Sequence, residues 1–255
     1  MKTIPQDVLK VLSTVEIEGT NVKSTGQLDR KLYLSVNEVL GSIGGKWNKK
    51  AKAHVFSEDP TDKLNAVIEC GVLEPKVKTG YFPTPPELVA RMIELAELDF
   101  KHMILEPSAG QGHIADEICS TTGLHPHEIM ICEVLPENIS ILRKKEYVVE
   151  ELEFFALADE LKSNKMDFDR ILMNPPFEKQ ADIGHVTTAF NLLADGGVLI
   201  AIISSGVLFR ENKKTTEFRE SILDKYAVLI ENNLDGSFKS SGTGVNTVMI
   251  KLVKE

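Results

Sequence analysis

An amide, two prolines and an aromatic ring stand together at residues 174–177, directly after the apolar run Ile171-Leu172-Met173. Proline has no backbone N–H and fixes φ, so this corner is rigid and its carbonyls are poorly placed to pair with a neighbouring strand. The side-chain oxygen of Asn174 and the carbonyl of Pro175 are two hydrogen-bond acceptors, and Phe177 adds a flat apolar face. Such a corner could hold a planar amine by both of its N–H groups. The plainer interpretation is a strand that ends in a loop.

A second candidate site is the glycine-containing loop 107–112, which follows Glu106. Its glycines allow a tight turn and the close approach of a ligand. It matches neither the dinucleotide fingerprint nor a P-loop, and an acid before the turn would repel a pyrophosphate. Glu133 ends the next apolar run about twenty residues later, where an acid can accept both ribose hydroxyls of an adenosine ligand. A nucleoside without phosphates but with a positive charge indicates S-adenosylmethionine, held by Glu106, Pro107, Ser108, Ala109, Gly110, Gly112 and Glu133.

Short apolar runs alternate with amphipathic stretches from about residue 80 onward, which predicts parallel strands buried on both faces between helices. The expected strands are 102–107, 128–134, 169–175, 197–205, 226–233 and 246–253, and the expected helices are 86–97, 111–121, 136–145, 180–195 and 214–224. The run 246–253 follows a loop and should return antiparallel. We therefore predict an open, Rossmann-like, doubly wound α/β sheet with its ligand site beyond the carboxyl ends of the strands.

The region 1–75 has a different character and is predicted to be a small α+β extension, with one helix at 28–43. Residues 30–54 hold six basic residues and one acid, so this segment carries +5 and the remainder −14 of the net charge of −9. A basic patch on an acidic body can serve as a docking surface for nucleic acid. The candidate contacts are Lys46, Trp47, Lys49 and Lys50. The alternative is an amphipathic element whose Trp47 packs against the main domain.

Composition narrows the function classes. No apolar run approaches the roughly 18 residues of a membrane span, and the first residues lack the apolar core of a secretory signal. Cys70, Cys119 and Cys132 are far apart, and the sequence has no CxxC motif and no cysteine–histidine pair at metal-site spacing. We expect a cytoplasmic protein with reduced thiols, no metal and no membrane partner.

The ordered motifs E-P-S-A-G-Q-G, Glu133 and N-P-P-F resemble the class I S-adenosylmethionine-dependent methyltransferases, and more narrowly the DNA adenine-N6 family. The segment 80–89, G-Y-F-P-T-P-P-E-L-V, is similar to the stretch that precedes the first strand in that family. The resemblance covers residues 80–255 and implies a seven-stranded sheet in a methyltransferase domain at 76–255. It also implies methyl transfer from S-adenosylmethionine to the N6 amine of an adenine flipped out of duplex DNA.

The resemblance also implies roles for single residues. Thr84 corresponds to the threonine that holds the cofactor's carboxylate, and Tyr81 and Phe82 belong to the segment that closes over its methionine end. A third strand should lead to Asp159, which resembles the acid that binds the cofactor's adenine. Asn174, Pro175 and Pro176 would provide the acceptors for the target amine. Phe177 would stack on the target base, and Phe238 would pack against it.

Other substrates remain open, because enzymes that methylate adenine in RNA or a glutamine side chain in proteins share the Asn-Pro-Pro-aromatic motif. A non-catalytic binding module is a further alternative. DNA adenine methylases with this motif order usually carry a separate target-recognition domain after the last motif. We therefore expect the basic N-terminal region, a recognition subunit or a second copy of the chain to read the DNA; the alternative is that the sequence specificity is weak.

Overall fold

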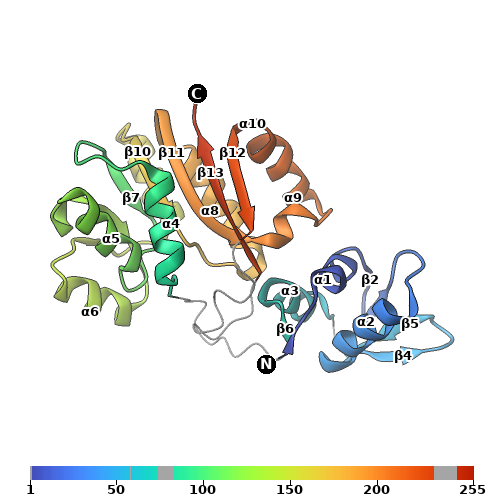
Figure 1. Cartoon of the computed structure of the whole chain (residues 1–255). Coiled ribbons are helices and arrows are strands. Elements are labelled where there is room, and N and C mark those ends of the chain that lie inside the picture. Colours follow the sequence, from blue (N-terminus) through green and yellow to red (C-terminus); the bar gives the residue numbers. More distant parts are fainter. Residues whose placement is uncertain (1, 58, 74–82, 233–245) are drawn as a thin grey trace.

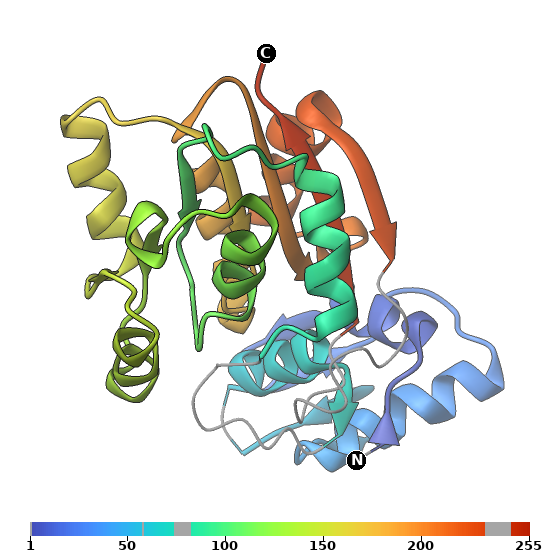
Figure 2. The ribbon, with the colours of Figure 1, turned by 60° about the vertical axis from the view of Figure 1, so that its left-hand side comes forward.

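The computed structural model describes residues 2–57, 59–73, 83–232 and 246–255 (Figure 1). A large α/β domain forms one part of the molecule. A smaller region, residues 2–73, lies beside it on the side where the parallel strands end (Figures 1 and 2). The predicted boundary at residue 75 falls outside the described residues. None of the helices in the described part of the chain is long and apolar enough to cross a membrane.

The main sheet has seven strands among the described residues, in the order β12-β13-β11-β10-β7-β8-β9. The strands are β7 (Ile104–Glu106), β8 (Met130–Cys132), β9 (Val149–Glu150), β10 (Phe168–Met173), β11 (Leu193–Ser204), β12 (Ala227–Asn232) and β13 (Thr247–Val253). β13 runs antiparallel to β11 and β12, while β7, β8, β9, β10 and β11 pair in parallel. This confirms the predicted doubly wound, mostly parallel sheet with an antiparallel last strand. Strand order reverses between β7 and β10, where such sheets bind ligands.

Helices cover both faces of this sheet, and neighbouring strand residues point into opposite layers because side chains alternate along a strand. One layer combines Leu105, Ile171 and Leu199 with α7 (Phe154–Ser163) and α8 (Ala181–Phe190). The other combines Ile104, Leu172 and Ile200 with α4 (Pro86–Ala96), α5 (His113–Thr122) and α6 (Pro136–Lys144). Burial on both faces explains the almost unbroken apolar runs of these strands.

Some expected elements differ from the observed ones. The helix predicted at 180–195 ends at Phe190, because Leu193 already pairs with Phe168 as part of the sheet. The helix predicted at 214–224 is divided into α9 (Lys213–Phe218), a π-helical turn (Arg219–Leu223) and α10 (Asp224–Tyr226). The 3-10 turns are Pro126–Glu128, Glu178–Gln180 and Ser205–Leu208. α7 was not predicted, because β9 before it is only two residues long.

The N-terminal region has a core of its own, with Val8, Leu40 and Leu64 among its buried residues. Its helices are α1 (Gln6–Ser13), α2 (Arg30–Ser42) and α3 (Thr61–Cys70), so the prediction of a single helix was incomplete. A four-stranded antiparallel sheet, in the order β2-β3-β5-β4, contains β2 (Glu16–Glu18), β3 (Asn21–Lys23), β4 (Lys46–Asn48) and β5 (Ala53–Val55). A separate pair joins β1 (Lys2–Thr3) to β6 (Val72–Leu73). The predicted small α+β extension is therefore present.

Candidate active site

A cavity of about 230 Å³ lies at the carboxyl ends of β7, β8, β9 and β10, next to the point where strand order reverses. It brings together most of the residues that the motifs predicted. The predicted residues that line it are Thr84, Glu106, Pro107, Ser108, Ala109, Gly110, Glu133, Asn174, Pro175, Pro176 and Phe177. The glycine loop and the Asn-Pro-Pro-Phe corner therefore face a common space.

The loop after β7 turns with two glycines in the left-handed region, Gly110 at φ 56° and Gly112 at φ 84°. The N–H of Ala109 donates to the carbonyl of Cys132 at 3.0 Å, which ties the loop to the end of β8. A Cβ on Gly112 would lie 2.8 Å from Cδ2 of Leu142. Gly112 thus allows the close packing of α5 against α6 and does not itself line the cavity.

Glu106 ends β7 with a carboxyl group that is almost completely buried, at 1% exposure. Its Oε2 accepts no hydrogen bond from the residues that the structure describes. Burial raises the pKa of Glu106 well above the usual range of a carboxyl group, and the nearby acids Asp116 and Glu133 raise it further. A buried polar atom without a partner is costly, so this oxygen is suited to a ligand that brings a hydrogen-bond donor or a positive charge.

Glu133 is held in one orientation by its own chain segment. Its Oε1 accepts the N–H groups of Val134 and Leu135 at 2.7 and 2.8 Å, and its Oε2 accepts from Nδ2 of Asn138 at 3.2 Å. A carboxylate has about four lone-pair directions, so these three bonds leave it able to accept from a ligand hydroxyl. The geometry presents a fixed acceptor at the rim of the cavity.

The Asn-Pro-Pro-Phe corner follows β10 and contacts the start of α4. Nδ2 of Asn174 donates to Oγ1 of Thr84 at 3.0 Å, which ties the corner to the segment before α4. Thr84 is buried, and it stands immediately before the two prolines that begin α4. Pro at the first helical position has the φ that a helix requires. Phe177 lines the cavity and also packs in the core layer of α4 and α5, so it is only 4% exposed.

The residues that line the cavity after β9 differ from the predicted one. Asp159 was expected at the end of the third strand, but it is an exposed residue within α7, and it does not line the cavity. The helix begins at Phe154, almost directly after β9, so Leu152, Glu153 and Phe154 occupy the expected position. The prediction placed this strand about ten residues too late.

His185 on α8 also lines the cavity, and sequence reasoning missed it. Its ring lies 4.8 Å from Phe155 and 5.6 Å from Phe154, measured between centroids. Burial lowers the pKa of His185 to about 4, so the ring is neutral at pH 7. Its Nδ1 has no hydrogen-bond partner in the described part of the chain. A lone histidine in an apolar helix carries no motif that could have identified it.

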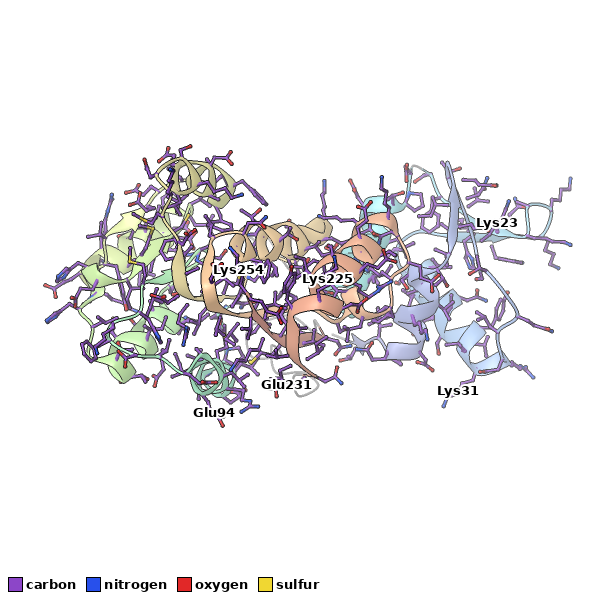
Figure 3. All side chains as sticks on the ribbon, turned by 90° about the horizontal axis from the view of Figure 1, so that it is seen from above. Lys23, Lys31, Glu94, Lys225, Glu231 and Lys254 are labelled. Atoms are coloured by element: carbon purple, nitrogen blue, oxygen red, sulfur yellow. The ribbon has the colours of Figure 1, made fainter. Side chains whose placement is uncertain are left out.

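Other predicted site residues lie elsewhere. Tyr81, Phe82 and Phe238 fall outside the described residues. Lys46 and Trp47 lie on β4, and Lys49 and Lys50 lie in the turn after it, at the end of the molecule remote from the main sheet (Figure 1). Trp47 is 47% exposed and contacts His54 of the neighbouring strand edge to face at 5.2 Å. The alternative that Trp47 packs against the main domain is therefore wrong. Lys23 and Lys31 extend from the same remote region (Figure 3).

No protein-family model and no curated protein matches the sequence. Among solved structures, a modification subunit assigned to a type I restriction enzyme from Vibrio vulnificus matches with a TM-score of 0.60 and 16% identity, over 88% of this chain and 53% of that chain. The EcoKI M protein of a type I restriction enzyme matches with a TM-score of 0.56 and 15% identity, over 98% and 57%. A protein from Pyrococcus horikoshii assigned as an RNA methyltransferase matches with a TM-score of 0.51 and 16% identity, over 71% and 91%.

These matches confirm the predicted resemblance at the level of the fold, which the chain shares with methyltransferases of known structure. The chain spans about half the length of the two type I subunits.

Proposed function

We propose that this protein transfers a methyl group from S-adenosylmethionine to the exocyclic N6 amine of an adenine in DNA. The observation that carries the proposal is that the rigid corner at Asn174 opens into the same cavity as the buried carboxyl of Glu106. An amine held at the corner and a cationic nucleoside held at the loop would meet in that space. S-adenosylmethionine supplies an electrophilic methyl group on a positively charged sulfur.

The residues around the cavity fit this cofactor. Glu106 has a buried oxygen that lacks a partner among the described residues, as expected for a group that receives a ligand. Glu133 presents its fixed carboxylate at the end of the next strand, where an acid binds ribose hydroxyls in dinucleotide sites. The neutral ring of His185 and the ring of Phe154 place two aromatic rings at one end of the cavity, which suits a base. Thr84 would hold the methionine part, as the family resemblance implies.

The reaction on this proposal depends on positioning. The amine of adenine is a poor nucleophile, because its lone pair is delocalised into the ring. Oδ1 of Asn174 and the carbonyl of Pro175 would accept its two N–H groups and favour a pyramidal nitrogen. Pro176 keeps the corner rigid and offers no competing donor. Phe177 would stack on the base and align the nitrogen for direct displacement, in which the N–C bond forms as the S–C bond breaks and the nitrogen then releases one proton to solvent. Such a step gains most from fixed geometry and preorganised acceptors.

DNA is favoured over other substrates by two observations. The fold match with the EcoKI M protein extends over 98% of this chain and so includes the N-terminal region, whereas the match with the P. horikoshii protein covers 71%. The N-terminal region also carries the basic segment on an acidic protein, and adenine would be flipped out of the duplex to reach the cavity. The matched Vibrio vulnificus protein is described as a subunit of a larger enzyme, and on that analogy we propose that a recognition subunit or a second copy completes DNA recognition.

The direct test is incubation of the protein with tritiated S-adenosylmethionine and, separately, duplex DNA, ribosomal RNA and cell protein. Label recovered from DNA as N6-methyladenine is the expected result. Label only in RNA would transfer the same chemistry to an RNA adenine, and label only in protein would favour a glutamine amide. Cofactor binding without label in any polymer would overturn the enzymatic proposal in favour of a binding module.

A further inference from the structure

Lys179 and Gln180, which one residue separates from the Asn-Pro-Pro-Phe corner, have an unusual backbone conformation. Lys179 has φ 53° and Gln180 has φ 58°, which places two consecutive residues with side chains in the left-handed region. Such residues are uncommon, and they persist where surrounding contacts hold them. The segment belongs to the 3-10 turn Glu178–Gln180, which joins the corner to α8.

The support comes from the N-terminal region. Glu69 of α3 accepts the backbone N–H of Lys179 with Oε2 at 2.9 Å, and the backbone N–H of Gln180 with Oε1 at 3.1 Å. Glu69 is 4% exposed. One carboxylate therefore binds two successive N–H groups through the main chain alone, so it stabilises the left-handed conformation independently of the two side chains.

Arg210 places this carboxylate in a larger buried cluster. Its Nη1 lies 3.7 Å from Oε1 of Glu69, and Arg210 is 3% exposed. Asp182 on α8 is the other buried acid near Arg210, and its Oδ2 accepts the N–H of Ser204 at 2.9 Å. The cluster thereby connects α3 with α8 and with the segment that follows β11.

We propose that Glu69 is a positioning residue for the transferase site, which holds the segment after Phe177 in its left-handed form and makes the N-terminal region a working part of the site. This inference rests on the proposed function. Phe177 is followed within three residues by both N–H groups that Glu69 binds, so the path of the chain after the ring is set by Glu69. The N-terminal region would then act on the geometry of transfer as well as on DNA binding.

The charge state of Glu69 should affect this contact. Burial, with a smaller contribution from Asp182, raises the pKa of Glu69 to about 7, against the opposing effects of Arg210 and of the amides of Lys179 and Gln180. Protonation removes acceptor capacity from the carboxyl group, so the segment should loosen as the pH falls through neutrality. Burial also raises the pKa of Asp182, to about 6, so measurements between about pH 6.5 and 8 separate the two acids.

The test compares wild type with Glu69→Gln, in which the amide keeps one acceptor and loses the other. We expect amide hydrogen exchange at Lys179 and Gln180 to become about tenfold faster, and single-turnover methyl transfer about tenfold slower, with the affinity for S-adenosylmethionine unchanged. Lys179→Gly added to Glu69→Gln should restore much of the rate, because glycine adopts the left-handed region without strain. In wild type, exchange at the two amides, corrected for intrinsic rates, should slow as pH rises across the same window.

Asp62→Asn is the matched control, because Asp62 contacts Lys179 between the same two segments through an exposed ion pair at 3.9 Å. It should change neither readout. Unchanged exchange in Glu69→Gln would overturn the inference, as would a slower rate that Lys179→Gly fails to improve. If Glu69→Gln does not fold, the pH dependence in wild type decides, and a flat profile counts against Glu69. If wild type methylates no substrate, the proposed function fails, while the exchange measurements still decide whether Glu69 holds the segment.

Discussion

The two halves of the candidate site are built over very different distances along the chain. In the half around Glu133, the carboxylate is fixed by residues one, two and five positions away. In the half around the Asn-Pro-Pro-Phe corner, Asn174 bonds to Thr84 across 90 positions, and Lys179 bonds to Glu69 across 110. The cofactor half is therefore largely self-contained, whereas the acceptor half depends on other parts of the fold. Substitutions should separate the two halves.

The largest effect is expected from Asn174→Ala. Loss of the side-chain acceptor should reduce methyl transfer by about a thousandfold, because a preorganised group at the reacting centre is removed. The dissociation constant for S-adenosylmethionine should change by less than about threefold, because Asn174 would act on the target amine and not on the cofactor. Single-turnover rates and calorimetric binding measure the two quantities. Asn191→Ala, at the exposed end of α8, is the control and should change neither. An equal loss of cofactor affinity would contradict the division into halves.

Glu106→Gln tests the cofactor half. Affinity for S-adenosylmethionine should fall by about thirtyfold, since a charged acceptor is worth about 2 kcal/mol in such a site. Burial raises the pKa of Glu106, so the folded protein holds this proton to a higher pH than the unfolded chain. The free energy of unfolding of wild type should therefore fall as pH rises above the ordinary carboxyl range.

Urea unfolding at about pH 5 and pH 8 measures this difference for both proteins. Glu106→Gln should gain stability relative to wild type at the higher pH, because the amide has no charge to bury. A variant that loses both affinity and stability at pH 8 would show that Glu106 is needed for folding instead.

Thr84→Val tests the contact that joins the two halves. Valine keeps the shape of threonine but cannot accept from Asn174, so methyl transfer should fall by about tenfold, or about 1.4 kcal/mol. Thr84→Ser keeps the hydroxyl and should retain most of the rate. Kinetics at saturating cofactor isolate this effect. If serine and valine behave alike, packing and not the hydrogen bond determines the role of Thr84.

The smallest effect is expected from substitutions in the basic segment, which lies far from the cavity. Lys49→Ser with Lys50→Ser should weaken DNA binding by about fivefold and reduce the salt dependence by about two counterions, with cofactor affinity unchanged. Lys162→Ser with Lys165→Ser, on the exposed side of α7 and just after it, is the charge-matched control. Titration of labelled duplex at several salt concentrations measures both. Equal effects of the two pairs would show that the basic segment is an ordinary solvent-exposed surface and makes no specific contact with DNA.

Sequence predicted the parts of the site that short-range patterns encode. The glycine loop, Glu133 and the corner each combine a strand end with residues that follow it directly, so their placement follows from the strand pattern alone. Asp159 was misplaced because β9 spans only Val149–Glu150, too short for a clear apolar run. Glu69 and His185 could not be found in this way, because their roles exist only after α3 and α8 pack against the corner and the cavity.

The pairing of β1 with β6 brings the first and last strands of the N-terminal region side by side (Figure 1). A unit whose two ends meet has the form of an exchangeable module, whose replacement leaves the strand order of the host sheet unchanged. Glu69 limits that exchange, because the carboxylate that binds Lys179 and Gln180 would leave with the module. A chimaeric protein would therefore gain the DNA-contacting surface of the donor module. Its rate of methyl transfer would fall unless the donor module carries an acid equivalent to Glu69.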